Sequence, residues 1–334
     1  MSKLVTIYGG SGFIGRYVAR RMAMQGWRVR CAVRNPHEAG FVRPYGTVGQ
    51  VEPVLCNVRD DRSVADVMQG ADAVVNCVGI LAPQGRNTFE AVQAEAPGRI
   101  ARLAAEAGIE RMVHVSAIGA DARSPSVYAR TKAAGEGAVL QHMPQAVILR
   151  PSIVFGPEDG FFNRFAGMAR LGPILPVVGA DTRFQPVYVD DVAQAAEMSV
   201  LGKAAPGIHE LGGPEVETFR DLMRMMLRII QRRRIVLNVP FVAARGMGAG
   251  FDLLHRISGG LISGPLTLDQ VRNLARDNVV GKDARTLGDL GISPTAMEAV
   301  LPGYLWRFRP SGQYAESKAS AQRLKGGSGR GGFG

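Results

Sequence analysis

Short apolar runs alternate with longer amphipathic stretches along the first half of the chain. The runs are rich in Val, Ile, Leu and Ala, and they have the lengths of buried strands. We expect strands at 3–8, 27–33, 51–56, 71–77, 111–116 and 146–149. Between them, apolar positions recur at helical spacing, which predicts helices at 17–26, 63–68, 89–107 and 126–141. This strict alternation predicts an α/β fold built on one doubly wound parallel sheet.

The pattern changes after residue 151. We expect a short helix at 161–171 and a loop at 172–176. A strand at 187–189 should lead into a helix that Asp190 and Asp191 are placed to cap. A last strand of the sheet is expected at 208–211, followed by mainly helical structure from 218 to about 305.

These elements predict two domains and a tail. A Rossmann-type nucleotide-binding domain should span 1–215, with 151–185 contributing partly to its cleft. A smaller, mainly helical C-terminal domain should span 216–310. Residues 311–334 are rich in Gly, Ser, Lys and Arg and lack a periodic apolar face, which predicts a disordered basic tail.

The chain is strongly basic. Its 334 residues include 40 Lys and Arg against 29 Asp and Glu, a net charge of +11. This balance favours an acidic partner: nucleic acid, anionic lipid or an acidic protein. No basic patch interleaved with aromatic residues and no helix-turn-helix pattern is visible, which argues against nucleic acid. No run of 18 apolar, uncharged residues predicts a membrane span.

The three cysteines, Cys31, Cys56 and Cys77, all fall in expected strands and form no C-x-x-C pair. We interpret them as small buried apolar residues in a reducing compartment. The histidines show no metal-ligand spacing either, so no metal site is expected.

A glycine-rich turn joins the first expected strand to the first helix. Such a turn lets backbone N–H groups approach a pyrophosphate, and the helix N-terminus then favours the phosphate charge. The residues expected to hold the nucleotide here are Gly9, Ser11, Gly12, Phe13, Ile14 and Gly15. The alternative is an ordinary glycine-rich turn.

The ends of the following strands indicate which nucleotide is bound. Arg34 stands where an acidic residue would hold a ribose 2′-hydroxyl, so the sequence favours NADP(H) over NAD(H), with Arg34 on the 2′-phosphate. Asp60 is a candidate for the adenine edge, or simply a loop-side turn residue. Cys77, Val78 and Gly79 end the fourth strand, where the backbone should pass the cofactor.

Tyr128 and Lys132 are four residues apart and therefore share a helix face. A nearby ammonium should lower the pKa of the tyrosine and suit it to acid–base chemistry. The same lysine can reach a nicotinamide ribose.

The glycine turn, the strand-end Ser116, the Tyr128/Lys132 pair, the segment 150–156 and the segment 189–193 together resemble the extended and atypical short-chain dehydrogenase/reductases. The resemblance implies that Tyr128 is the general acid/base, that Lys132 orients it, and that Pro151 and Ile153 line the nicotinamide end. That family usually has a Ser or Thr just beyond the strand-end serine, whereas this chain has Ala117 and Ile118. We therefore expect an intact binding apparatus and an incomplete catalytic one, with the Ser116 hydroxyl satisfied by backbone.

Four segments resemble a narrower family, the nucleotide-binding accessory subunits of respiratory complex I and their bacterial relatives: 116–121, 124–132, 266–274 and 277–280. The resemblance implies a structurally held NADPH and a place on the peripheral arm near the membrane. With no transit segment visible, we expect a bacterial protein on the cytoplasmic face of the inner membrane. The alternative is an active reductase, dehydrogenase or epimerase acting on a hydrophobic substrate such as a quinone, a sterol-like compound or an isoprenoid.

A basic amphipathic helix is expected in the C-terminal domain, with Arg220, Arg224, Arg228 and Arg232 recurring every four residues. This face could meet anionic lipid or an acidic protein, or it could simply be solvated. The apolar, glycine-containing segment 241–265 is expected to be either an exposed apolar cap or a pocket lid.

Overall fold

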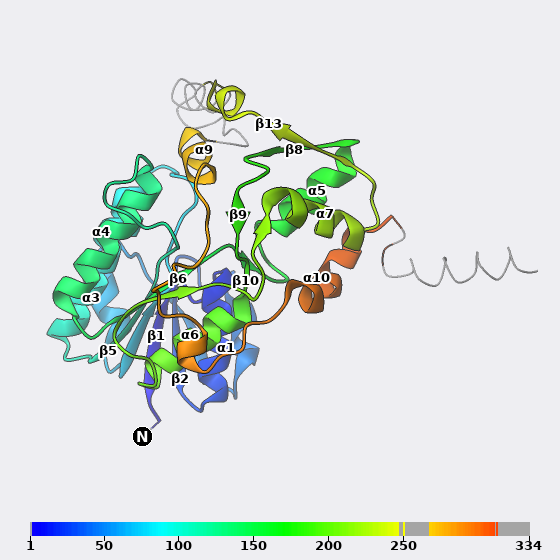
Figure 1. Ribbon diagram of the computed structural model, residues 1–334. Coiled ribbons are helices and arrows are strands. Elements are labelled where there is room, and N and C mark those ends of the chain that lie inside the picture. The colour runs from blue at the N-terminus through cyan, green and yellow to red at the C-terminus, as the bar shows by residue number, and fades with distance from the viewer. Residues whose placement is uncertain (1, 247–249, 251–266, 311, 313–334) are drawn as a thin grey trace, which may run out of the picture.

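The computed structural model describes residues 2–246, 250, 267–310 and 312 of the chain (Figure 1). Its centre is a seven-stranded sheet in the order β11-β6-β5-β4-β1-β2-β3, and all neighbouring strands in it are parallel. The strands are β1 (Leu4–Tyr8), β2 (Arg28–Val33), β3 (Val51–Leu55), β4 (Ala73–Asn76), β5 (Arg111–Val115), β6 (Val147–Pro151) and β11 (Gly207–Leu211). The doubly wound parallel sheet predicted from the sequence is confirmed.

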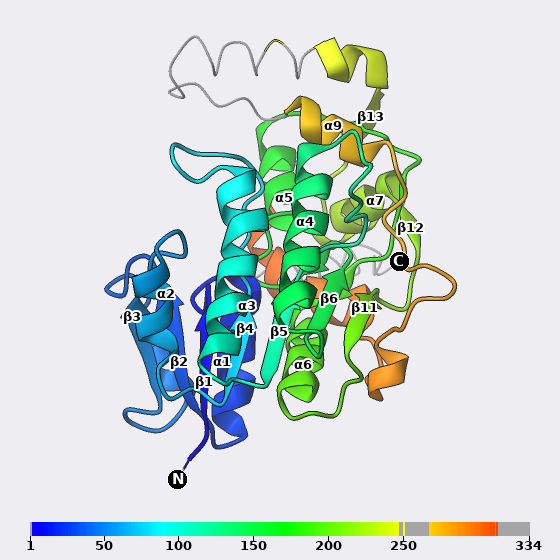
Figure 2. The ribbon, with the colours of Figure 1, turned by 90° about the vertical axis from the view of Figure 1, so that its left-hand side faces the viewer.

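Helices cover both faces of this sheet (Figures 1 and 2). On one face, α1 (Phe13–Met24) and α6 (Val189–Val200) pack against each other and against the strands. On the other lie α2 (Asp61–Met68), α3 (Ala96–Glu106) and α4 (Val127–His142), with the π-helical turn η2 (Glu90–Glu95) leading into α3. A short 3₁₀ helix, η1 (Gly40–Tyr45), contacts β3 and α1. Buried apolar side chains of the strands fill both interfaces, as expected for a sheet covered on both faces.

A second lobe follows β6 and has its own aromatic core. Its elements are β7 (Val154–Phe155), α5 (Phe162–Leu171), β8 (Ile174–Val178), β9 (Arg183–Phe184), β10 (Val187–Tyr188), β12 (Glu217–Thr218), α7 (Phe219–Ile229), β13 (Ile235–Val239), α9 (Leu268–Leu274), α10 (Met297–Leu305) and η4 (Trp306–Phe308). Phe161 contacts Phe162, Phe165 and Phe219 with ring centroids 5.1–5.5 Å apart. This core joins residues from 153–188 with residues from 219–230 and 297–308, so the lobe is discontinuous in sequence.

Two expectations for this lobe were wrong. The segment expected to be a loop at 172–176 is strand β8, which pairs in parallel with β13, a strand in a region expected to be helical. Pro173 and Pro176 favoured a loop in the sequence, but a two-stranded ribbon tolerates proline because only one side of each strand is bonded. Leu175 is buried between the exposed Ile174 and Pro176, and Val177 is buried after Pro176, which is the alternation of a strand.

The start of α6 also differs from the prediction. Tyr188 is its N-cap residue, and no side chain caps the helix there. Asp190 instead forms an ion pair with Arg21 of α1, and Asp191 accepts hydrogen bonds from the N–H and the hydroxyl of Thr295. The two carboxylates therefore fasten α6 to neighbouring segments rather than capping it.

The chain returns to the large sheet near its C-terminal end. Leu287, Leu290 and Ile292, around the turn η3 (Gly288–Leu290), are buried in the same core as α1 and α6. The predicted basic tail, 311–334, lies outside the described residues except for Gly312, and so does most of the apolar segment 241–265.

Candidate functional site

The glycine turn between β1 and α1 is tightly folded. Gly9 has a φ of +77°, and its carbonyl oxygen accepts the Gly12 N–H at 2.9 Å. A Cβ added at Gly15 would lie 2.2 Å from that same oxygen, so no larger residue fits. Gly12 is the N-cap residue of α1, and no side chain caps it. In contrast, α2, α4, α7 and α9 are capped by Asp60, Ser126, Thr218 and Thr267. The first N–H groups of α1 therefore remain available for an anionic ligand.

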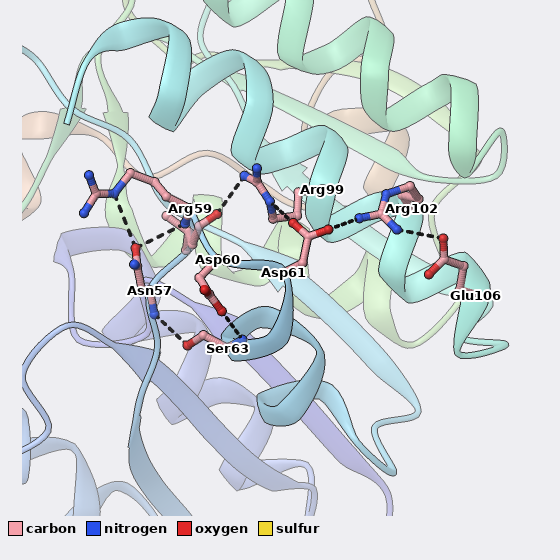
Figure 3. Close-up of polar contacts among 9 residues, drawn as sticks. Asn57, Arg59, Asp60, Asp61, Ser63, Arg99, Arg102 and Glu106 are labelled. Carbon is pink, nitrogen blue, oxygen red and sulfur yellow. Dashed lines mark hydrogen bonds and ion pairs between the residues drawn. The ribbon is translucent and has the colours of Figure 1, made fainter. Parts of the chain in front are cut away.

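Arg34 and Asp60 lie beyond the ends of β2 and β3. Arg34 is exposed and makes no hydrogen bond or ion pair with another described residue. The Asp60 carboxylate accepts the Ser63 N–H at 2.7 Å and caps α2 (Figure 3). Sequence reasoning did not select Arg59, whose guanidinium donates to Asn57 Oδ1 at 3.3 Å beside Asp60. Roles for Arg34 and Asp60 on the adenosine half of a nucleotide stay predictions.

The neighbouring Asp61 ties α2 to α3. Its carboxylate pairs with Arg99 and Arg102, and Arg102 also pairs with Glu106 at 2.8 Å (Figure 3). The hydrogen bond from Arg99 is the main reason why the pKa of Asp61 lies below its usual value. This network holds the loop that follows β3 without using Arg59 or Asp60.

Lys132 lies at the ends of β4 and β5. Its ammonium donates to the carbonyl of Val115 at 3.2 Å, and a Cβ added at Gly79 would be 3.6 Å from Nζ. Burial lowers the pKa of Lys132 to about 8, although the charges of Glu136 and Cys77 act in the other direction. The lysine thus stands beside the backbone that the sequence assigned to the cofactor.

Tyr128 lies one turn earlier on α4. Its half-buried ring packs edge-on against Phe89, with centroids 5.8 Å apart. Burial raises the pKa of Tyr128 to about 12. The predicted lowering by Lys132 is therefore wrong for this structure, because burial dominates and the ammonium bonds to the Val115 carbonyl instead.

Two polar atoms near the end of β5 are buried without a partner. Among the described residues, the Ser116 hydroxyl and His114 Nε2 have no hydrogen bond, so the expected backbone partner of Ser116 is not there. His114 Nδ1 lies 3.1 Å from Asn76 Nδ2, and Asn76 Oδ1 accepts the Val78 N–H at 3.0 Å. Burial, assisted by the charge of Lys132, lowers the pKa of His114 to about 3 and keeps the ring neutral.

These orphaned atoms fit a site that a polar ligand completes, because unsatisfied buried polar groups are costly. A nicotinamide nucleotide offers hydroxyl and amide groups of the right kind, and the glycine turn offers the phosphate cradle. Asn76 and His114 were missed in the sequence. The detectable signal was a polar residue inside an otherwise apolar strand.

A segment from the C-terminal part, residues 267–281, crosses this region; we call it the strap. Its helix α9 stands beside the N-terminal end of α4 (Figures 1 and 2). The Asp269 carboxylate accepts the Ser126 hydroxyl at 2.8 Å, the Val127 N–H at 2.7 Å and the Tyr128 N–H at 3.2 Å. The strap therefore holds the first turn of the helix that carries Tyr128 and Lys132.

Asn278 of the strap lies next to the segment that lacks the expected hydroxyl. Its side chain accepts the Ser152 hydroxyl at 2.6 Å and donates to the Ile118 carbonyl at 3.3 Å. The Ile118 N–H is bonded to the Pro151 carbonyl at 3.0 Å, and Ile153 packs against the second core. Hydrogen bonds within the protein thus occupy the main-chain groups of Ile118 and the hydroxyl of Ser152.

Comparisons with known proteins identify the family of the chain. Residues 5–207 match the model of the NAD dependent epimerase/dehydratase family. The chain belongs to that family. It is also 33% identical, over 92% of its length and 79% of the relative, to the mitochondrial NADH dehydrogenase [ubiquinone] 1 alpha subcomplex subunit 9 of Arabidopsis thaliana. A ceramide reductase of Caulobacter vibrioides is 29% identical over 75% of this chain and 77% of the relative.

Solved structures of other proteins share the fold at low sequence identity. A UDP-glucose 4-epimerase of Thermus thermophilus with NAD superimposes with a TM-score of 0.66 at 18% identity, covering 92% of this chain and 99% of that one. An NADPH-dependent quinone oxidoreductase of Escherichia coli with NADPH gives 0.68 at 16% identity, covering 90% and 98%. Two different nicotinamide nucleotides therefore occur on this fold.

Neither a membrane span nor a metal cluster is visible in the described ranges. None of the helices there combines the length and apolar character needed to cross a bilayer. No group of three His, Cys, Asp or Glu side chains in the same ranges is arranged to hold a metal ion, and Cys31, Cys56 and Cys77 are free thiols.

Proposed function

We propose that this protein holds a nicotinamide nucleotide, preferentially NADP(H), as a structural or redox-sensing cofactor in an assembly of the respiratory complex I type. The nucleotide itself is supported by membership of the family and by the tight glycine turn with its uncapped helix. The preference for NADP(H) rests on the exposed Arg34. A guanidinium at this position can bind a 2′-phosphate, whereas a carboxylate would repel it.

The observation that carries the non-catalytic part of the proposal is the strap. A reductase of this class needs a hydroxyl to polarise the substrate oxygen and space for the substrate beside Tyr128. Here Ala117 and Ile118 stand in place of that hydroxyl, and Asn278 bonds to Ile118 and Ser152. Tyr128, with a pKa of about 12, is a poor proton donor and acceptor near neutral pH. Tyr128 and Lys132 then act as ribose ligands.

The proposed partner and location follow the relatives. Subunits of the mitochondrial NADH dehydrogenase align over most of this chain, which supports a membrane-associated complex as the partner. We propose a bacterial protein that is peripheral on the cytoplasmic face of the inner membrane, in contact with anionic lipid.

An active reductase is the second candidate, and one observation favours it. The Caulobacter relative is named for reduction of ceramide, a hydrophobic substrate, and Tyr128 and Lys132 are both present in this chain. In that reaction Lys132, with its pKa of about 8, would supply positive charge beside Tyr128 while the nucleotide exchanges hydride.

Gentle purification from native membranes separates the two candidates. We expect the nucleotide released from the protein to be NADPH, the protein to comigrate with complex I, and added carbonyl or quinone compounds not to oxidise the bound NADPH. Tyr128→Phe should leave nucleotide content largely intact. A free protein that turns over NADPH, and loses turnover in Tyr128→Phe, would establish the reductase instead.

A further inference from the structure

The outer face of the β8–β13 ribbon is apolar and exposed. Ile174 of β8 is the register partner of Ile235 of β13, and these side chains are 49% and 66% exposed. Leu237, two residues along, is 48% exposed, and Leu171 at the end of α5 is 89% exposed. We call Leu171, Ile174, Ile235 and Leu237 the apolar ridge. The strands β8 and β13 lie at the top of Figure 1, on the side of the second lobe away from the large sheet.

An arginine-lined cavity adjoins this ridge. It has a volume of about 610 Å³ and is lined by Arg224, Leu227, Arg228 and the run Gln231–Arg234, directly before β13. Between residues 222 and 246 the chain has six arginines and no Asp or Glu. The lining of the cavity therefore includes five arginines and no carboxylate.

Main-chain carbonyl groups hold two of these arginines in place. Arg232 Nε donates to the Phe308 carbonyl at 2.9 Å, and Arg234 Nε donates to the Ala169 carbonyl at 2.8 Å. Gln231 has a left-handed φ of +54°, which turns the chain out of α7 and into the arginine run. The guanidinium groups are fixed by neutral acceptors, so their charge is not cancelled.

Ion pairing in the described part of the chain leaves most of this charge uncompensated. Arg224 has a carboxylate partner, Asp221 at 3.3 Å, whereas Arg228 and Arg233 pair with no described residue. The pKa of Arg232 is lowered by burial and by the nearby charges of Arg234 and Arg170. Crowded cations of this kind call for an anionic counterpart.

We propose that the apolar ridge and the arginine cavity form one docking face for an anionic lipid bilayer. The ridge would enter the boundary between headgroups and acyl chains, and the arginines would contact lipid phosphates. A membrane fits better than an acidic protein for two reasons. The cations border exposed aliphatic side chains, and residues 222–246 contain no Asp or Glu that could pair with the basic residues of a protein partner and fix its orientation. This inference deepens the membrane-peripheral location proposed above and does not depend on the bound nucleotide.

Vesicle sedimentation with the full-length protein tests the proposal. The vesicles contain phosphatidylcholine alone or phosphatidylcholine with phosphatidylglycerol, each at low and high salt. We expect binding to the anionic vesicles only, weakened by salt. Arg228→Gln and Arg233→Gln should each weaken binding about fivefold, the effect of one arginine near an anionic surface. Leu171→Ser should weaken it without changing the salt dependence.

Arg28→Glu is the matched control. Arg28 is an exposed arginine at the N-terminal end of β2 in the large sheet, and it belongs to neither the apolar ridge nor the arginine cavity. It should reduce binding far less than Arg228→Glu. Thermal unfolding and nucleotide content are measured on every variant, so that loss of folding or of the proposed cofactor is distinguished from loss of docking. Equal binding to neutral vesicles, or full binding by Arg228→Glu, would overturn the proposal. So would an absence of vesicle binding combined with salt-sensitive binding to an acidic protein of the complex.

Discussion

Replacement of Asp269 by alanine tests whether the strap supports the nucleotide site. The carboxylate accepts three hydrogen bonds at the start of α4, two of them from the main-chain N–H groups of Val127 and Tyr128. Hydrogen bonds to a charged group contribute about 1.5–3 kcal/mol each, and water recovers part of this at a half-exposed helix end. We therefore expect Asp269→Ala to lower the free energy of unfolding by about 2–3 kcal/mol. Asp269→Asn keeps one acceptor oxygen and should cost about half as much.

Urea unfolding and nucleotide titration measure the two effects separately. Because Tyr128 and Lys132 lie on the first two turns of α4, loosening its start should weaken nucleotide binding about tenfold, within the usual range of coupling energies. Asp289→Ala is the matched control. Asp289 accepts the Thr286 N–H at 2.6 Å within its own turn, so its loss should cost about 1 kcal/mol and leave nucleotide affinity unchanged. If the two variants behave alike in both assays, the strap does not support the site.

Substitutions at three further positions test individual parts of the site. Arg34→Asp should weaken NADPH binding by about 2 kcal/mol or more while changing NADH binding little, and equal losses would remove Arg34 from the 2′-phosphate. Gly15→Ala should abolish nucleotide retention and lower stability, because its Cβ would lie 2.2 Å from the Gly9 carbonyl oxygen. Gly137→Ala is the control, because its Cβ would meet nothing within 4 Å, and it should stabilise the protein by about 0.5–1 kcal/mol. His114 stays neutral when folded but is protonated when unfolded below its ordinary pKa, so stability is lost as the pH falls from about 6.5 toward 3. Between about pH 7 and pH 5, His114 should account for a loss of about 2 kcal/mol in the free energy of unfolding. In His114→Gln, the free energy of unfolding measured with urea should therefore fall by about 2 kcal/mol less over this pH range. An unchanged pH dependence would contradict a neutral buried ring.

Local patterns were enough to predict the large sheet and the elements around it. Apolar runs and glycine turns specify β1 to β6, and the expected ends of these strands lie within two residues of those observed. The strands β8 and β13 were missed for two reasons. Two prolines obscure the apolar–polar alternation of β8, and the arginine-rich end of α7 obscures the start of β13. In addition, each strand forms only by pairing with the other. A contact that joins residues 61 positions apart has no signature in either segment alone.

The same limit explains which site residues the sequence revealed. Gly9, Gly12 and Gly15 act through local backbone geometry, so spacing alone can predict them. The hydrogen bonds of Asp269 to α4 and of Asn278 to Ile118 span more than 140 residues. Nothing in the sequence of the strap itself indicates that it bonds to α4 and to Ile118. The raised pKa of Tyr128 was missed for a related reason, since burial is a property of the folded chain.

The return of the C-terminal chain to the sheet links the nucleotide site to the second lobe. From the strap, the chain runs through Leu287 and Leu290 in the core beside α6, then through Thr295 bonded to Asp191, and into α10. α10 packs on α7, the helix that ends in the arginine cavity. A ligand that stabilises α4 thus stabilises a chain segment that also completes the lobe bearing the docking face. A nucleotide that binds without turnover would in this way favour the folded form of that lobe. This role requires only binding, so it does not need the catalytic hydroxyl that Ala117 and Ile118 lack.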